Sequence, residues 1–286
     1  MLTGLAPAKI NLVLEVLGKR DDGYHEIRSL VQTISLYDVL CFELDEGISL
    51  DCTEASLQSS DNLAIQAARL LKEVSGCEKG VKIGLEKRIR WGAGLGGGSS
   101  DAAAVLLAIN KLWGLELATS DLVGLGAKLG SDVPFFIYKG TALVEGRGER
   151  VTPLLASAST WFVLLLPPLP QMPGKTQQLY ARLDDRRFTQ GQFSGKAVEA
   201  WSGDRQISPS LLFNVFDGVA FDAFPGLEEY WKRFEEAGGA DIHLAGSGPA
   251  LFAPVDSEAE AEELHRRLCQ QGLEAYSVSS VTPEVV

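Results

Sequence analysis

Residues 91–101 read Trp91-Gly-Ala-Gly-Leu-Gly-Gly-Gly-Ser-Ser-Asp101 and place five glycines directly before an alanine-rich segment, which predicts a helix from about residue 100 to residue 112. Glycine lets the backbone come close to a ligand and turn its N–H groups inward. The helix N-terminus adds about half a positive charge. Together they favour an anion site for nucleotide phosphates, with a flexible linker or a plain helix cap as the alternative.

Two well-known phosphate motifs fit this segment poorly. Gly92-x-Gly94-x-x-Gly97 matches the dinucleotide fingerprint, but that fingerprint requires a buried parallel strand before it. The preceding residues, 82–90, are amphipathic and basic, with four basic residues against Glu86. A Gly-x-x-x-x-Gly-Lys-[Ser/Thr] loop does not occur in the sequence. If a nucleotide binds, the sequence therefore predicts a phosphate loop of a third type.

The composition limits the partners and the compartment. The 286 residues include 38 acidic and 26 basic side chains, so the net charge of −12 disfavours binding to nucleic acid or to an anionic membrane surface. Four scattered cysteines without a Cys-x-x-Cys pair, and three histidines, make a zinc site improbable and fit a reduced cytosolic chain. The apolar stretches are too short for a membrane span, and residues 1–10 lack a signal core, so we expect a cytoplasmic protein.

The periodicity predicts unequal runs of strands and helices, which favours an α+β fold. Asp61 or Asn62 can cap the first helix. A proline-rich loop over 167–173 cannot be a central strand, so we predict a domain boundary that gives domains 1–155 and 156–286. The C-terminal order resembles a split βαβ, ferredoxin-like layer. The predicted strands cover residues 8–16, 27–35, 39–44, 81–85, 141–145, 161–166, 241–244, 251–254 and 275–281, and the predicted helices cover 62–74, 100–112, 120–130, 227–237 and 258–271.

Two shorter segments have a plain structural interpretation when they are considered alone. Gly246-Ser-Gly248 lies between two predicted strands and is typical of an ordinary hairpin. Gly130 suits a left-handed position at the end of a helix, and Pro134 is expected to stop that helix. Asp132, between them, is then a turn residue.

Four segments taken together resemble the GHMP kinases, a family of small-molecule kinases. They are Ala6-Pro-Ala-Lys-Ile-Asn-Leu12, residues 92–100, Gly130-Ser-Asp-Val-Pro134 and Ala245-Gly-Ser-Gly-Pro249. Gly18-Lys-Arg-Asp-Asp-Gly-Tyr-His25 resembles the branch that acts on 4-diphosphocytidyl-2-C-methyl-D-erythritol, whereas the Gly-Glu-His element of the mevalonate and galactose enzymes is absent. The resemblance implies a two-domain α+β GHMP kinase fold, with an N-terminal ribosomal-S5-domain-2-like domain and a C-terminal ferredoxin-like domain.

The resemblance also implies a reaction and its central residues. Such kinases transfer the γ-phosphoryl group of ATP to the 2-hydroxyl of this substrate in the non-mevalonate pathway of isoprenoid precursor biosynthesis. Asp132 matches the catalytic aspartate and Lys9 its partner lysine. Phosphoryl transfer depends mainly on positioning and charge stabilisation, which suits such a pair. Asn11 lies two residues beyond Lys9, hence on the same strand face, and is expected to bind substrate or Asp132.

Further residues match substrate and nucleotide positions of the family. Tyr24 and His25 match its cytidine site, Tyr180 a second aromatic ring on the cytosine, and Gly246, Ser247 and Gly248 a contact to the substrate phosphates. Asn62 and Lys87 match positions near the adenine. Mg²⁺ is expected with ATP. Ser99 and Ser100 can cap the helix, bond a phosphate or bond this ion. The segment that surrounds the ATP phosphates is Arg90, Trp91, Gly92, Ala93, Gly94, Leu95, Gly96, Gly97, Gly98, Ser99 and Ser100.

Two departures and three alternatives accompany this interpretation. Arg90 stands where the family usually has proline, and Ala245 replaces a common serine or threonine. The alternatives are a related kinase for another alcohol, a dinucleotide-dependent oxidoreductase and a non-catalytic ligand-binding relative. A cytosine clamp argues against the first, the missing buried strand against the second, and Lys9 with Asp132 against the third. The expected oligomeric state is a monomer or a homodimer.

Overall fold

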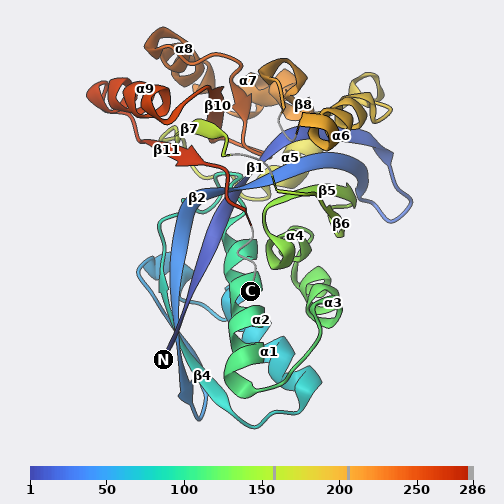
Figure 1. Ribbon diagram of the computed structural model, residues 1–286, viewed down its shortest axis with the longest axis vertical. Coiled ribbons are helices and arrows are strands. Elements are labelled where there is room, and N and C mark those ends of the chain that lie inside the picture. Colours follow the sequence, from blue (N-terminus) through green and yellow to red (C-terminus); the bar gives the residue numbers. More distant parts are fainter. Residues whose placement is uncertain (157–158, 205–206, 283–286) are drawn as a thin grey trace. The chain divides into compact units, whose positions relative to one another are not determined.

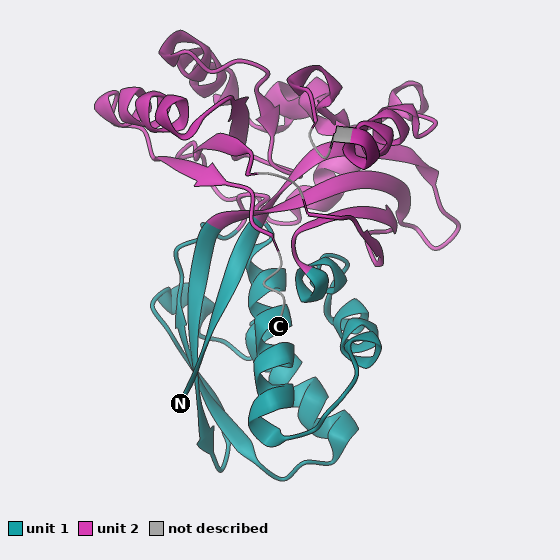
Figure 2. Ribbon diagram, viewed as in Figure 1, with its two compact units in different colours: residues 1–8, 36–91, 96–138 teal, residues 9–35, 92–95, 139–286 magenta. Residues whose placement is uncertain are grey.

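The computed structural model describes residues 1–156, 159–204 and 207–282 and divides the chain into two compact units (Figure 2). Unit 1 comprises Met1–Ala8, Leu36–Trp91 and Gly96–Tyr138, and unit 2 comprises Lys9–Ser35, Gly92–Leu95 and Lys139–Val286. Two long strands, β1 (Leu2–Lys19) and β2 (His25–Asp45), have residues in both units. The separate strands predicted at 27–35 and 39–44 are thus parts of one continuous strand.

The strands of unit 1 are built on the second half of β2. Strand β4 (Gly80–Glu86) pairs antiparallel with Val39–Asp45 of β2 and parallel with β3 (Ile48–Cys52). Val81, Ile83 and Leu85 are buried while Lys82 and Glu86 are exposed, which confirms the predicted half-buried strand. Strand β3 was not predicted from the sequence.

The helices of unit 1 are α1 (Leu63–Ser75), α2 (Gly97–Trp113), α3 (Thr119–Leu129) and α4 (Val133–Tyr138), with a 3₁₀ turn at Ala55–Leu57. Helix α2 packs against α1 and α4 (Figure 1). It begins three residues before the predicted start, because Gly96 adopts the left-handed conformation that precedes its first turn. None of the helices within the described ranges is long and apolar enough to cross a membrane.

Two predictions about residues 130–134 are wrong. Gly130 has φ 178° and ψ 155°, so it ends α3 in extended backbone rather than in the left-handed region. Pro134 does not stop a helix but lies in the first turn of α4. Proline is well tolerated there, because the first N–H groups of a helix have no intrahelical partner.

Unit 2 contains one sheet that extends the first half of β2. Strand β5 (Thr141–Gly146) pairs antiparallel with Ile27–Gln32 and with β6 (Arg150–Pro153). The two-residue strand β8 (Phe213–Asn214) pairs parallel with β1 at Val13 and Leu14.

The second sheet of unit 2 confirms the ferredoxin-like prediction. Its strands are β7 (Trp161–Leu165), β9 (His243–Leu244), β10 (Leu251–Val255) and β11 (Ala275–Ser279), in the spatial order β11-β7-β10-β9, and every pair is antiparallel. Helices α8 (Leu227–Ala237) and α9 (Glu258–Gln270) contact each other, and α9 lies on β7 and β11 (Figure 1). Counted along the chain the order is 4-1-3-2, which is the split βαβ arrangement.

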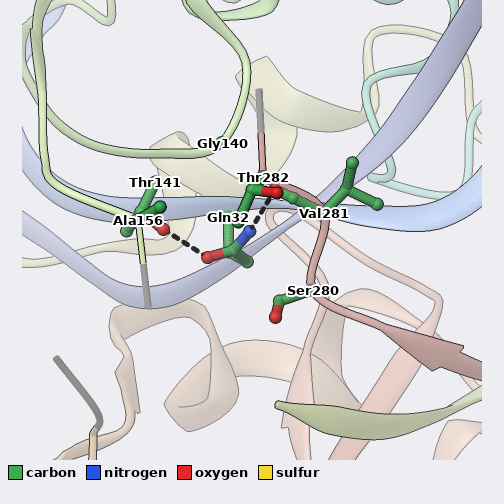
Figure 3. A pocket seen from close by; sticks show the side chains of 7 residues that line it. All are labelled: Gln32, Gly140, Thr141, Ala156, Ser280, Val281 and Thr282. Atoms are coloured by element: carbon green, nitrogen blue, oxygen red, sulfur yellow. Dashed lines mark hydrogen bonds between the residues drawn. The ribbon is translucent and has the colours of Figure 1, made fainter. Parts of the chain in front are cut away.

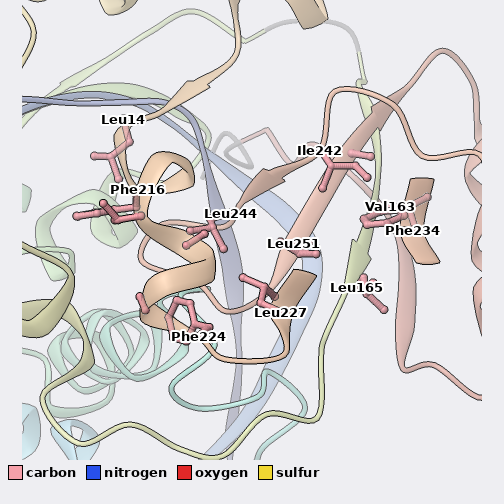
Figure 4. Packing of buried hydrophobic residues seen from close by; sticks show 14 of the residues in the cluster. Leu14, Val163, Leu165, Phe216, Phe224, Leu227, Phe234, Ile242, Leu244 and Leu251 are labelled. Atoms are coloured by element: carbon pink, nitrogen blue, oxygen red, sulfur yellow. The ribbon is translucent and has the colours of Figure 1, made fainter. Parts of the chain in front are cut away.

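A hydrophobic cluster joins these elements into the core of unit 2 (Figure 4). Phe234 of α8 and Leu251 of β10 are fully buried, and Phe216 is 1% exposed. The remaining elements of the unit are α5 (Lys175–Arg182), α6 (Gln192–Asp204), α7 (Ala220–Ala223) and the 3₁₀ turns Asp185–Arg187, Pro209–Leu211 and Val215–Val219.

A small pocket in unit 2 is lined by the groups that fasten the end of the described chain to β2 (Figure 3). Gln32 donates from Nε2 to the Val281 carbonyl over 3.1 Å and accepts at Oε1 from the Thr141 hydroxyl. The Val281 N–H donates to the Thr33 carbonyl over 2.8 Å. The neutral polar groups of this pocket therefore serve an anchoring contact.

Candidate active site

The backbone of the glycine-rich segment requires glycine at alternate positions. Gly92, Gly94 and Gly96 have φ values of 75°, 92° and 74°, which are strained for residues with a side chain. A Cβ atom on Gly94 would lie 2.1 Å from the Ala245 carbonyl oxygen, so the backbone of Gly94 lies directly against the glycine turn at 245–248. The Ala250 N–H donates to the Ala93 carbonyl over 3.2 Å. Within unit 2, the start of the glycine loop is therefore attached to that turn.

Lys9 and Asn11 form a buried polar cluster beside the same turn in unit 2. The Lys9 N–H donates to the Leu95 carbonyl over 3.0 Å, and its ammonium donates to Asn11 Oδ1 over 2.6 Å. Asn11 Nδ2 donates to Ser29 Oγ over 2.8 Å. A Cβ on Gly246 would lie 2.7 Å from Lys9 Nζ. The strand period predicts this shared face for Lys9 and Asn11, and the contact with Gly246 places the turn beside both.

Asn214 holds the glycine turn and the strand before it by hydrogen bonds. Its Nδ2 donates to the carbonyls of Leu244 and Gly246 over 2.9 and 2.8 Å, and its side chain is buried. The Asp217 carboxylate accepts from the Leu244 N–H and lies 2.8 Å from His243 Nδ1. Burial raises the pKa of Asp217, and the contact with His243 opposes the rise. The buried amide of Asn214 thus holds the glycine turn and the strand before it, and the partly buried carboxylate of Asp217 adds a bond to that strand.

The other part of the glycine-rich segment belongs to unit 1 and forms the first turn of α2. Ser100 Oγ is buried and has no hydrogen-bond partner among the described residues. Asp132 directly precedes α4, and a Cβ on the neighbouring Gly130 would lie 3.9 Å from Ser99 Oγ. The turn that carries Asp132 therefore lies beside the N-terminus of α2.

Lys87 is not free to bind a ligand through its ammonium, because two buried carboxylates surround it. Its Nζ lies 2.5 Å from Asp38 and 2.8 Å from Asp101, and the three side chains are 6%, 0% and 3% exposed. Asp38 also accepts from the N–H groups of Arg88 and Ile89. Burial acts to lower the pKa of Lys87, but Asp101 and Asp38 together raise it. The cluster ties the end of β4 to α2.

Within this cluster, the carboxyl group of Asp101 has a raised pKa. Burial raises its pKa to about 7, with Lys87 opposing the rise and Asp38 adding to it. Its Oδ1 is buried without a hydrogen-bond partner among the described residues. The Asn62 amide is used in a cap: Oδ1 accepts from the Ala64 N–H and Nδ2 donates to the Leu57 carbonyl. Asn62 is thus confirmed as the cap of α1.

The expected cytidine residues gather in unit 2. The His25 ring stacks on Tyr180 with centroids 4.6 Å apart and planes at 20°. Burial lowers the pKa of His25, with a smaller effect from Lys19, and its Nε2 has no partner among the described residues. Tyr24 is half exposed, and the Arg147 guanidinium lies 5.1 Å over its ring. Tyr180 also packs on the hydrophobic cluster, so it faces His25 and the core together.

Comparisons with known proteins identify the family of this chain. The GHMP kinases N terminal domain matches residues 62–140, and the GHMP kinases C terminal domain matches residues 200–274. A 4-diphosphocytidyl-2-C-methyl-D-erythritol kinase of Dehalococcoides mccartyi is 47% identical over 283 residues, which cover 99% of each chain. The chain belongs to the 4-diphosphocytidyl-2-C-methyl-D-erythritol kinases, within the GHMP kinases.

Other members of this kinase family extend the match. The enzyme of that name from Symbiobacterium thermophilum is 41% identical over 91% of this chain and 93% of its own. A crystal structure of 4-(cytidine 5'-diphospho)-2C-methyl-D-erythritol kinase superposes with a TM-score of 0.84 at 35% identity and covers 99% of this chain and all of the other. Homoserine kinase from Cytophaga hutchinsonii, with a TM-score of 0.73 at 19% identity over 98% of this chain and 94% of its own, shares the fold.

The structure groups the expected residues of this kinase into separate sets. Lys9, Asn11 and the glycine turn lie together in unit 2, as do Tyr24, His25 and Tyr180, whereas Ser99, Ser100 and Asp132 lie in unit 1. Trp91 is 44% exposed and Arg90 is half-buried. Sequence reasoning missed the support from Asn214. Asn214 carries no local signal, because it contacts segments far away in the sequence.

Proposed function

We propose that this chain transfers the γ-phosphoryl group of ATP to the 2-hydroxyl of 4-diphosphocytidyl-2-C-methyl-D-erythritol, giving the 2-phosphate and ADP. The observation that carries the proposal is the family match over 99% of the chain, with Lys9, Asp132 and the glycine loop retained. The reaction belongs to the non-mevalonate pathway of isoprenoid precursor biosynthesis. We place this reaction in the cytoplasm. We also propose a domain boundary near residue 155.

The glycine loop and α2 are the proposed binding site for the ATP phosphates. Gly92, Gly94 and Gly96 are left-handed, a conformation that favours anion binding by backbone N–H groups. The first turn of α2 has N–H groups without intrahelical partners and a positive dipole, which also favour an anion. Arg90 and Trp91 precede this loop, and Asn62 and Lys87 are proposed to lie near the adenine.

Ser99 and Ser100 fit an Mg²⁺ ion that accompanies ATP. The hydroxyl oxygen of Ser100 is buried without a partner among the described residues, and oxygen atoms are the ligands that Mg²⁺ prefers. When bound, the ion neutralises phosphate charge. The two serines would hold it from the first turn of α2.

Asp132 and Lys9 are the proposed catalytic pair. Asp132 accepts the proton of the substrate 2-hydroxyl, and its position beside the N-terminus of α2 suits a group that acts next to bound phosphates. Lys9 stabilises charge on the transferred phosphoryl group, with its ammonium oriented by Asn11. Gly246, Ser247 and Gly248 hold the substrate phosphates through backbone N–H groups.

The cytidine moiety is proposed to bind at Tyr24, His25 and Tyr180. Tyr24 offers an exposed ring for stacking, and the unpartnered Nε2 of His25 offers a hydrogen bond to the base. Tyr180 fixes the orientation of the His25 ring by stacking on it. Such a site distinguishes this kinase from relatives whose alcohol substrate carries no nucleotide.

The deciding experiment is a turnover assay with ATP and 4-diphosphocytidyl-2-C-methyl-D-erythritol, followed by ADP release. We expect turnover by the wild type and a loss of about 10²–10⁴-fold in kcat for Asp132→Asn, because general-base catalysis contributes about that much. Asp222→Asn, at an exposed position of α7, is the matched control and should keep full activity. Absence of turnover by folded wild type would overturn the proposal.

A further inference from the structure

Lys175, the first residue of α5, lies between two glycine-containing backbone segments of unit 2. Its Nζ donates to the Gly92 carbonyl over 2.8 Å and also to the Gly248 carbonyl. Gly92 starts the glycine loop and Gly248 ends the glycine turn, and the two are 156 residues apart in the sequence. One side chain therefore bridges both segments.

The position of this ammonium is electrostatically costly. Both partners are neutral carbonyls, and a cation in the first turn of a helix opposes the helix dipole. Burial, and next the positive charge of Lys9, lower the pKa of Lys175 to about 7. A lysine that served only solubility would turn its ammonium into water, as long charged side chains generally do. The Lys175 ammonium instead points to the carbonyls of Gly92 and Gly248 and links their two backbone segments, a link that we call the tie.

Neighbouring contacts also connect the glycine turn to α5 and to the start of the glycine loop. The Thr176 hydroxyl lies 3.2 Å from the Ser247 hydroxyl, so α5 approaches the glycine turn at two consecutive residues. On the other side, the Ala250 N–H bonds the Ala93 carbonyl. The start of the glycine loop is thus bounded by the turn itself and by the first turn of α5.

We propose that Lys175 is a positioning residue for phosphoryl transfer, because it ties the start of the glycine loop to the glycine turn and fixes the backbone against which the phosphates bind. The inference rests on the proposed function. Lys175 acts through the carbonyls of Gly92 and Gly248, and it need not contact a substrate. Without the hydrogen bonds from Lys175, the loop glycines can sample more conformations. Phosphate binding must then order the loop, which weakens the binding.

The test combines a measurement on the free protein with a kinetic one. Hydrogen exchange of the Lys9 and Ala250 amides, whose N–H groups donate to the Leu95 and Ala93 carbonyls of the loop, is compared between wild type and Lys175→Met without any ligand. At pH 6, where Lys175 is protonated, we expect exchange to be about tenfold faster or more in the variant, since a hydrogen bond from a charged donor corresponds to at least that factor in an equilibrium. In the turnover assay, KM for ATP should rise by about the same factor while kcat falls less, because the tie orders the binding site.

Two further variants separate a tie from general stability. Lys232→Met removes an exposed lysine of α8 in the same unit and should change neither readout. Lys175→Arg keeps a donor that reaches two carbonyls and should recover part of the loop protection and of the KM. If Lys175→Met does not fold, Lys175→Gln, which lacks the charge and can bond only one carbonyl well, replaces it with the same expectation.

The outcomes are distinct from those of the function assay. Unchanged exchange of the Lys9 and Ala250 amides in a folded Lys175→Met protein, or a KM for ATP within twofold of wild type, overturns the inference. If the wild type does not turn over the substrate, the proposed function fails, while the exchange experiment and the affinity of the free protein for ATP still decide whether Lys175 holds the loop.

Discussion

Replacing Lys87 by methionine tests the buried cluster that ties β4 to α2. Methionine keeps most of the length of the lysine stem, so packing changes little while the charge disappears. The ammonium now lies 2.5 and 2.8 Å from Asp38 and Asp101, with all three side chains at most 6% exposed. Removal of one partner from such a pair leaves a buried, uncompensated charge, which costs about 3–5 kcal/mol. We expect that loss of unfolding free energy at pH 8.

The loss should be concentrated at Asp101. Asp38 retains two backbone N–H donors after the substitution, whereas Asp101 Oδ1 already has no partner in the described part of the chain. The pKa of Asp101, raised to about 7 by burial, is held down by Lys87, so the variant raises it further. A raised carboxyl pKa stabilises the folded protein as the pH falls through it, because the folded state then binds a proton that the unfolded state does not.

The pH dependence follows from that sign. Between pH 8 and pH 6 the deficit of Lys87→Met should shrink by up to about 1.4 kcal/mol for each pH unit over which Asp101 is protonated in the variant but ionised in the wild type. Asp101→Asn in the Lys87→Met background should recover part of the loss at pH 8. Urea unfolding followed by circular dichroism at both pH values measures this, with Lys82→Met on the exposed face of β4 as the control. A deficit below about 1 kcal/mol, or one equal at pH 8 and pH 6, refutes the reasoning.

Three further predictions concern the loop, a cap and the base site. Gly94→Ala should lower kcat/KM by at least about tenfold, because its Cβ meets the Ala245 carbonyl and its φ of 92° strains alanine; Gly124→Ala, with open space around it, should keep wild-type kinetics. Asn62→Ala should lower the urea midpoint by an amount equivalent to about 1 kcal/mol, the usual value of an N-cap, while Asn62→Asp retains most of it. Cytidine diphosphate should raise the melting temperature of the wild type, and less so in Tyr24→Ala than in Tyr24→Phe, which keeps the ring; equal protection by uridine diphosphate would count against base recognition at this site.

The elements that the sequence predicts well are those with local signals. Helix α8 has the predicted bounds because glycines with positive φ flank an amphipathic segment at both ends. The alternation of buried and exposed residues likewise predicted β4 in unit 1. The order of strands and helices in the C-terminal part of the chain predicted the ferredoxin-like sheet. At Gly130 the same logic failed, because a glycine after a helix does not have to adopt positive φ when the chain continues directly into another helix.

The site was predictable only where a motif marks it. Lys9 and Asn11 share a face because strand residues two apart point the same way, which is a local rule. The contacts that support them are not local. Lys87 meets Asp38 across 49 residues, and Asn214 meets the Gly246 carbonyl across 32. Single lysines and asparagines are common in any sequence, so only the folded chain shows which groups they meet.

The division of the two long strands between the units has a consequence for inheritance. The chain passes from one unit to the other five times, after residues 8, 35, 91, 95 and 138. Neither unit is therefore encoded by one uninterrupted stretch of gene. A single recombination event anywhere between residues 9 and 138 would combine pieces of both units from different parent genes. We therefore expect the two units of this kinase to be inherited together and to diverge together.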